Sequence, residues 1–214
     1  MRLFVLTRHA HSTLNVDGRV NGDPAVPVPL TEQGREEARR LGSQLAQLPL
    51  ELCIHTRFAR TRETADEILR DRGVPYLEEP LLDDVDVGDL EGATIAEYRA
   101  WKREHRRSDP FPGGESLDDA ATRYARAFRG LLDHSEQTIL VVCHEIPIRY
   151  ALNAAAQAEP EQPLGRHRKR RLGAAAGSDD LDGPEHAIPN ATPYLFDGES
   201  LARAAERIQE LSGE

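Results

Sequence analysis

Three short, largely apolar runs most constrain how this chain of 214 residues can fold. They cover residues 3–7, 50–55 and 138–144, and each one ends at polar or charged side chains. Runs of this length without strict alternation are typical of strands that are covered on both faces, as in parallel sheets. Amphipathic segments lie between them. The sequence therefore predicts an α/β fold, a three-layer α/β/α sandwich with a mostly parallel sheet.

Helical periodicity and capping residues locate the other elements. Ala38 and Leu41 begin a series of apolar residues at steps of three and four, on one face of a helix that Thr31 can cap. Ser116 can cap a later helix, with Asp119 three residues on as in a capping box. We predict helices over 31–48, 57–72, 94–105 and 116–133, a late strand over 193–196, and a short helix from residue 200.

The length of the chain suits one domain, which we expect to span residues 1–214. Between about 156 and 189 the periodicity is lost and Pro, Gly, Ala, Asp and Arg dominate, which indicates a surface insertion. We interpret the basic run at 166–171 within it as a solvated stretch. Cys53 and Cys143 each fall in an apolar run, and we interpret them as small buried hydrophobes rather than a disulfide.

The formal net charge of −10 limits the partners of this protein. An acidic protein repels nucleic acid and anionic membrane surfaces, so we expect neither as a partner. No run approaches the roughly 20 apolar residues of a membrane-spanning helix, and the first residues lack a signal-peptide pattern. We therefore expect a cytoplasmic protein, in which any bound anion meets positive charge concentrated in a pocket.

Such a concentration is predicted where the three apolar runs end. The first run leads into Arg8 and His9, the second into a segment that holds Arg60, and the third ends at His144. Ligands of open α/β sheets bind outside the carboxyl ends of the strands. If the three strands are neighbours, these side chains converge there, and arginine forks suit the paired oxygens of a phosphate.

The same residues lie in segments that resemble the histidine phosphatase superfamily, whose fold is phosphoglycerate-mutase-like. The stretch from Arg8 to Ser12, RHAHS, with Asn15 after it, is similar to the signature of that family. Five further segments resemble family segments in the same order, at residues 29–38, 56–65, 81–92, 112–116 and 141–149. Each match alone is moderately specific for the family. The occurrence of all these segments in the order found in the family is strongly specific for it.

The resemblance implies a phosphoryl transfer that needs no metal or other cofactor. It implies that His9 is the nucleophile that forms a phosphohistidine and that Asp84 is the proton donor. It also implies a group of residues that bind the substrate phosphate, namely Arg8, Asn15, Arg60 and His144.

The chain departs from the family pattern at three positions. Ala10 replaces the usual glycine, so we expect mild strain or a shifted loop if that position needs a positive φ or a close approach of the backbone. His11 follows where the family varies. Asp84 stands where glutamate is commoner, and Asp83 and Asp86 are neighbouring alternatives that could instead cap a turn. Glu145 stands where glycine is frequent. Because an acidic residue at the latter position is the proton donor in the acid-phosphatase branch, Glu145 is an alternative acid, although we favour Asp84.

Three functions are compatible with these residues. The preferred one is hydrolysis of a small phosphorylated metabolite by a phosphomonoesterase, with a homodimer left open. The first alternative is a cofactor-dependent phosphoglycerate mutase, although the glutamate that mutases tend to show after Arg-His-Gly is absent, since His11 stands there. The second alternative is a non-catalytic module that binds a phosphate ligand.

Overall fold

The computed structural model describes residues 2–157, 181 and 188–213. Its central sheet has five strands in the order β3-β2-β4-β1-β5. All neighbouring strands run parallel except β5, which pairs antiparallel with β1 at one edge. The strands are β1 (Leu3–Arg8), β2 (Leu52–His55), β3 (Tyr76–Glu78), β4 (Thr138–Cys143) and β5 (Pro193–Asp197). The three predicted strands are thus direct neighbours, with β4 between β1 and β2.

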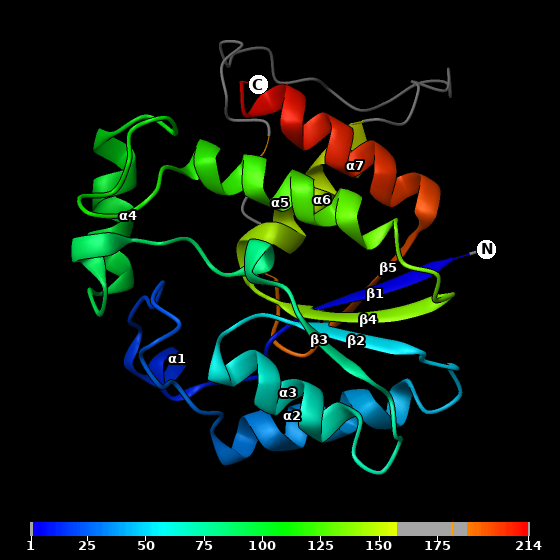
Figure 1. Cartoon of the computed structure of the whole chain (residues 1–214). Coiled ribbons are helices and arrows are strands. Elements are labelled where there is room, and N and C mark those ends of the chain that lie inside the picture. The colour runs from blue at the N-terminus through cyan, green and yellow to red at the C-terminus, as the bar shows by residue number, and fades with distance from the viewer. Residues whose placement is uncertain (1, 158–180, 182–187, 214) are drawn as a thin grey trace, which may run out of the picture.

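Helices cover both faces of this sheet, which confirms the predicted three-layer fold (Figure 1). α2 and α3 lie on one face, α5, α6 and α7 lie on the other, and α1 and α4 lie beyond the carboxyl ends of the strands. The helices are α1 (Thr13–Asp17), α2 (Glu32–Gln44), α3 (Ala59–Ile68), α4 (Ile95–Glu104), α5 (Leu117–Leu131), α6 (Glu145–Gln157) and α7 (Gly198–Leu211), with 3₁₀ turns at Pro80–Leu82 and Gly88–Leu90.

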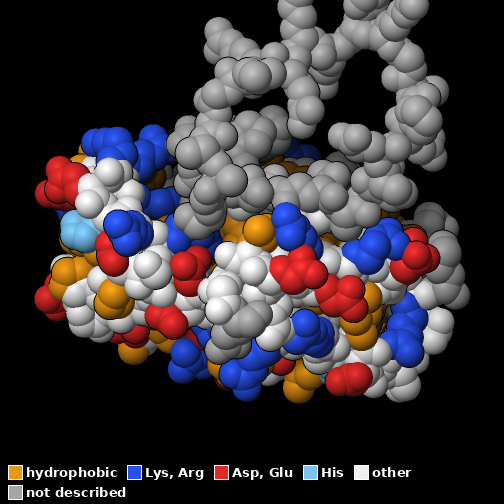
Figure 2. Space-filling model, turned by 90° about the horizontal axis from the view of Figure 1, so that it is seen from above, with side chains coloured by type: hydrophobic (Ala, Val, Ile, Leu, Met, Phe, Trp, Pro, Cys, Tyr) orange, Lys and Arg blue, Asp and Glu red, His pale blue; other side chains and the backbone are white. Residues whose placement is uncertain are grey.

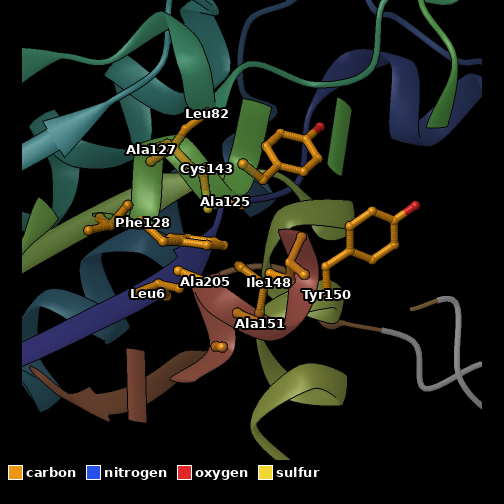
Figure 3. Packing of buried hydrophobic residues seen from close by; sticks show 14 of the residues in the cluster. Leu6, Leu82, Ala125, Ala127, Phe128, Cys143, Ile148, Tyr150, Ala151 and Ala205 are labelled. Carbon is orange, nitrogen blue, oxygen red and sulfur yellow. The ribbon is translucent and has the colours of Figure 1, made fainter. Parts of the chain in front are cut away.

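Alternate residues of β1, β2 and β4 belong to two different cores. On β1, Leu6 packs into the larger core with α5, α6 and α7, whereas its neighbour Val5 packs into the core beneath α2 and α3. Figure 3 shows the larger core, where Leu6 and Cys143 of the sheet meet Phe128 of α5 and Ile148 of α6. Apolar side chains project from both faces of the central strands and pack into the two cores. The polar residues at the carboxyl ends of these strands are therefore held in place at the edge of the sheet.

The capping residues act as predicted. The Thr31 side chain accepts a hydrogen bond from the backbone of Gly34 at the start of α2, and Ser116 with Asp119 forms a complete capping box at the start of α5. The predicted helix over 57–72 is shorter than expected, because Phe58 is its N-cap and α3 ends at Ile68.

Three elements have no counterpart in the sequence predictions. β3 has three residues, too few for a periodic signal. α1 has five residues and no buried side chain. α6 contains Pro147, which its first turn tolerates because the nitrogen there needs no intrahelical partner. Since α6 extends to Gln157, helical structure enters the first two positions of the predicted insertion.

The rest of the predicted insertion, including the basic run at 166–171, lies outside the described residues except for Leu181 and residues 188–189. Cys53 and Cys143 are both buried and free, as interpreted from their positions. No helix within residues 2–157 or 188–213 is long and apolar enough to cross a membrane.

Basic and acidic side chains are interspersed over the described surface in the view from above (Figure 2). Many of them form short-range pairs along helices, such as Glu199 with Arg203 on α7. Pairs of this kind leave little local excess of either sign. An excess of positive charge lies instead in a pocket at the carboxyl ends of the strands.

Candidate active site

That pocket has a volume of about 540 Å³ and lies between the strand ends, α1, α4 and the start of α6. Among the described lining residues, cationic side chains outnumber carboxylates seven to two. The carboxylates are Asp84 and Glu145. The cations are Arg8, Arg19, Arg60, Arg99, Lys102, Arg103 and Arg149. An acidic protein has thus gathered positive charge at one site, as the sequence predicts for an anion pocket.

His9 follows the last residue of β1 and is 4% exposed. Its backbone N–H donates to the carbonyl of Cys143 at 2.9 Å, which extends the β1–β4 pairing into the site. Its Nδ1 lies 2.8 Å from the carbonyl oxygen of Ala10 and can bond to it only as a donor, so the neutral ring keeps its lone pair on Nε2. Burial lowers the pKa of His9 well below that of an ordinary histidine, and Arg60 and Arg8 lower it further. His9 is therefore a neutral imidazole with a free nitrogen.

His144 follows β4 and faces His9, with ring centroids 5.6 Å apart. Its Nε2 lies 2.9 Å from Oγ1 of Thr56, which in turn lies 2.9 Å from Oγ1 of Thr61. Its Nδ1 lies 3.2 Å from a guanidinium nitrogen of Arg60. Burial and the charge of Arg60 lower the pKa of His144 well below the ordinary value. The two threonines orient the ring from behind, so its other nitrogen faces Arg60.

Arg60 lies in the first turn of α3 and is 4% exposed. One guanidinium nitrogen donates to the side-chain oxygen of Asn21, and the other donates to the backbone oxygen of Asn21 at 3.2 Å. The Asn21 amide also donates to Glu91 at 2.8 Å, and so the loop itself is anchored. Asn21 holds the guanidinium against His144. The sequence predictions missed this residue because it lies in an irregular loop whose only signal was its glycines and prolines.

Asp84 lies in the loop after the first 3₁₀ turn, and its Oδ2 is 3.2 Å from Arg60 and 3.4 Å from Nδ1 of His144. Its Oδ1 accepts from the backbone N–H of Val85 at 3.1 Å. Burial raises the pKa of Asp84 above that of an ordinary aspartate, against the opposing effect of Arg60. A carboxyl group in this position can hold a proton more readily than one in water.

Glu145 is the first residue of α6, and its carboxylate lies between two arginines. Oε2 is 2.9 Å from a guanidinium nitrogen of Arg8, and Oε1 accepts from Arg149. Arg8 ends β1, and the same nitrogen also donates to the carbonyl of Ile188 at 2.9 Å. The structure thus brings Arg8, His9, Arg60, Asp84, His144 and Glu145 to one site from four separate segments.

The comparison with known families agrees with this geometry. The sequence profile of the histidine phosphatase superfamily, branch 1, matches residues 4–173. The chain belongs to this superfamily. The 2,3-bisphosphoglycerate-dependent phosphoglycerate mutase 2 of Gloeobacter violaceus is 33% identical over 177 residues, which cover 76% of this chain and 79% of that protein.

Two solved structures are also similar to this histidine phosphatase. A candidate alpha-ribazole-5′-P phosphatase from Escherichia coli is 28% identical with a TM-score of 0.65, over 74% of this chain and 81% of that one. Bacillus stearothermophilus YhfR is 25% identical with a TM-score of 0.73, over 92% of this chain and 91% of that one. These likenesses confirm the predicted family and fold.

The remaining predictions for this histidine phosphatase have mixed outcomes. Asn15 lines the pocket, but its side-chain oxygen accepts from the backbone and hydroxyl of Ser12, which leaves its amide for other contacts. His11 is outside the pocket lining, since its ring lies 3.1 Å from the hydroxyl of Thr31. Asp86 accepts from the backbone of Gly88, so it caps a turn.

The positive φ angle that would strain an alanine is absent at Ala10. Among the described residues, positive φ angles occur at only two non-glycine positions, and Ala10 is neither of them. Its side chain is fully buried in the core beneath α2, and its N–H donates to the hydroxyl of Thr64 at 2.9 Å. Alanine fits this position without a backbone cost.

Proposed function

We propose that this histidine phosphatase hydrolyses a phosphomonoester of a small metabolite through a phosphohistidine at His9. The observation that carries the proposal is the state of the His9 ring: buried, neutral, held through Nδ1 by Ala10, and beside Arg60. A nucleophile must present a lone pair, and a histidine in this state presents it at neutral pH.

In the first step the lone pair of His9 Nε2 attacks phosphorus, and a nitrogen–phosphorus bond forms as the bond to the alcohol oxygen breaks. Asp84 gives its proton to the leaving oxygen, so a neutral alcohol departs. In the second step Asp84 takes a proton from water while the water oxygen attacks phosphorus. The nitrogen–phosphorus bond breaks, inorganic phosphate is released, and both side chains return to their starting states.

Arg8, Arg60 and His144 are proposed to bind the oxygens of the transferred phosphoryl group. Arg8 and Arg60 are positively charged donors that are already in place, and such donors stabilise the charge of the transition state without reorganisation during the reaction. Arg60 is the best placed, because Asn21 fixes it from one side and it reaches both Asp84 and His144 on the other. Asn15 is proposed to add its free amide at the edge of the phosphate.

Asp84 is the proposed acid rather than Glu145. Asp84 lies beside His144 and Arg60, and burial raises its pKa, as an acid at neutral pH requires. Both carboxylate oxygens of Glu145 are instead engaged by guanidinium groups, one of Arg8 and one of Arg149.

Phosphoglycerate mutase activity is the second candidate, because the relative from Gloeobacter violaceus bears that name at 33% identity. A mutase returns the phosphoryl group to a second hydroxyl, whereas a phosphatase gives it to water. Incubation with 3-phosphoglycerate separates the two: a mutase yields the isomer and a phosphatase yields free phosphate. We expect free phosphate from whichever phosphoesters the enzyme accepts.

The direct test is hydrolysis of p-nitrophenyl phosphate in the presence of EDTA. We expect turnover by the wild type and by His134→Ala, whose histidine pairs with Glu136 away from the pocket. His9→Ala should show none, and acid-labile phosphohistidine should form only in proteins that keep His9. An active His9→Ala variant contradicts the proposal, and phosphate binding without any turnover identifies a binding module instead.

A further inference from the structure

The carboxylate of Glu145 forms ion pairs with two arginines that line the proposed phosphate site. It pairs with Arg8 at 2.9 Å through one oxygen and with Arg149 through the other. All three residues line the same pocket as His9. The proposed mechanism needs Arg8 for the phosphate and gives neither Glu145 nor Arg149 a step.

This contact differs from the surface ion pairs of the chain. Glu199 and Arg203 of α7 have the same spacing and also lie in the first turns of a helix, but their side chains are 83% and 42% exposed. The side chain of Glu145 is 29% exposed, and that of Arg149 is 17% exposed. Solvent screens the α7 pair strongly and the Glu145 pair weakly, so the charge of Glu145 acts on whatever enters the pocket.

Each of the two arginines, Arg8 and Arg149, has one guanidinium N–H that could donate a hydrogen bond to an anion. The Nε atoms of Arg8 and Arg149 are buried and have no hydrogen-bond acceptor among the described residues. A buried N–H without an acceptor is unfavourable, and an anionic ligand would relieve it. Arg8 also donates to the carbonyl of Ile188 at 2.9 Å, so a second contact holds it in place without Glu145.

The charge near the phosphate position depends on Glu145. Arg8, Arg60 and Arg149 contribute three positive charges there, and Glu145 cancels one of them. A phosphate dianion that reaches Arg8 enters beside a like-charged carboxylate, and such a juxtaposition opposes binding. Glu145 thus opposes the anion twice: it repels the phosphate and engages the donors that the phosphate needs.

We propose that Glu145 is an internal competitor of phosphate for Arg8 and Arg149, and that it limits the affinity of the pocket so that inorganic phosphate leaves after hydrolysis. This inference rests on the proposed function only for the statement that the pocket binds phosphate. Glu145 is a positioning residue, because it acts through the two arginines and makes no contact with the reacting atoms.

The test is titration calorimetry with inorganic phosphate, which measures binding without turnover. Glu145→Gln keeps the shape of the side chain and removes its charge, so the dissociation constant of phosphate should fall about tenfold, as expected when a like-charged neighbour is removed. Glu199→Gln is the matched control, and its dissociation constant should equal that of the wild type. In hydrolysis of p-nitrophenyl phosphate, Glu145→Gln should show a lower KM and stronger inhibition by phosphate.

Glu145→Asp provides a second variant if the glutamine protein does not fold. Aspartate keeps the negative charge, but its side chain is one methylene shorter, so the ion pairs with Arg8 and Arg149 both weaken. Phosphate should therefore bind about two- to threefold more tightly to this variant than to the wild type. Unchanged or weaker phosphate binding in the folded variants overturns the inference. Tighter binding in Glu145→Gln with no turnover in the wild type leaves the competition between Glu145 and phosphate standing, and removes the proposed hydrolysis together with the role in product release.

Discussion

The Nδ1 atom of His9 lies 2.8 Å from the carbonyl oxygen of Ala10, the next residue in the chain. The orientation of the proposed nucleophile therefore depends on its own backbone, and no carboxylate is needed to fix the tautomer. The backbone is itself fixed, because His9 donates its N–H to β4 and Ala10 donates its N–H to Thr64 of α3. Sheet pairing on one side and a helix on the other thus determine where Nε2 lies.

Replacement of Ala10 by the glycine of the family pattern should lower stability without improving activity. Ala10 is fully buried and has no positive φ angle, so the folded protein gains nothing from the wider φ range of glycine. Glycine makes the unfolded chain more flexible and leaves a small void in the folded protein where the methyl group was. We expect a loss of about 1 kcal/mol in the free energy of unfolding for Ala10→Gly. Urea denaturation measures this loss, and kcat for p-nitrophenyl phosphate should stay within about twofold of the wild type, since strain is absent. A large gain in kcat would show that alanine does distort the site.

Asp84→Asn should slow hydrolysis of an alkyl phosphate far more than hydrolysis of p-nitrophenyl phosphate. An alkoxide leaves poorly without a proton, whereas p-nitrophenolate leaves readily. We expect kcat to fall about 100-fold or more with the alkyl substrate, which is the usual range for a lost general acid. In the proposed mechanism the protonated form of Asp84 is the active one, so wild-type kcat should fall as the pH rises through its pKa, which burial has raised.

The asparagine variant cannot titrate and should lose this alkaline decline. Glu145→Gln should keep it, because its carboxylate is not the acid. If instead Glu145→Gln alone shows the loss specific to the alkyl substrate, Glu145 is the proton donor and the assignment of Asp84 is wrong.

The sequence was most informative where several weak signals share one physical cause. The apolar runs of β1, β2 and β4 are continuous because helices cover both faces, and neighbouring parallel strands bring Arg8, His9 and His144 to one edge. These residues could therefore be predicted from strand ends alone.

Residues whose role depends on loop geometry could not be predicted in this way. Asn21 reaches Arg60 from an irregular loop, and Arg149 reaches Glu145 from a helix whose early proline obscured it. Thr56 and Thr61 looked like ordinary positions near a strand end, yet they form the hydrogen-bonded chain behind His144. Such partners have no periodic signal, because tertiary contacts alone determine them.

Two buried histidines should make the folded protein less stable in mild acid. Burial, with the charge of Arg60, lowers the pKa of both His9 and His144. In the unfolded chain each regains a pKa near ~6.5, so below that pH the unfolded state binds more protons than the folded state. The free energy of unfolding therefore falls as the pH drops below about 6.5, and these two groups leave it unchanged above that pH.

Urea denaturation at pH 7.5 and pH 5.5 measures this effect. His9→Gln should lose roughly 1 kcal/mol less stability between the two pH values than the wild type, since one proton-binding difference is removed. His134→Gln is the control and should behave as the wild type. Asp84 has a shift of opposite sign, but it is present in all three proteins and cancels in the comparison. Equal losses in His9→Gln and the wild type would show that His9 titrates normally in the folded state.

Asn21→Ala should reduce catalysis although Asn21 takes no part in any chemical step. Its side-chain oxygen is an acceptor for the buried guanidinium of Arg60, so alanine leaves that donor without its partner and free to move from His144. A hydrogen bond to a charged group contributes about 1.5–3 kcal/mol, which corresponds to a roughly tenfold or greater loss in kcat/KM. Asn153→Ala, which removes a bond to Leu181 outside the pocket, is the control.

Asn21→Asp distinguishes a role in positioning from general damage to the loop. Aspartate keeps an oxygen for Arg60 but loses the amide that donates to Glu91. Arg60 therefore keeps its acceptor while the loop loses one anchor, and kcat should remain closer to the wild-type value than in Asn21→Ala. The added negative charge near the phosphate position should raise KM, because it repels the substrate dianion. This split between KM and kcat is the outcome expected if Asn21 acts through Arg60. If both variants lose kcat equally, the loop matters for folding and the acceptor oxygen of Asn21 does not.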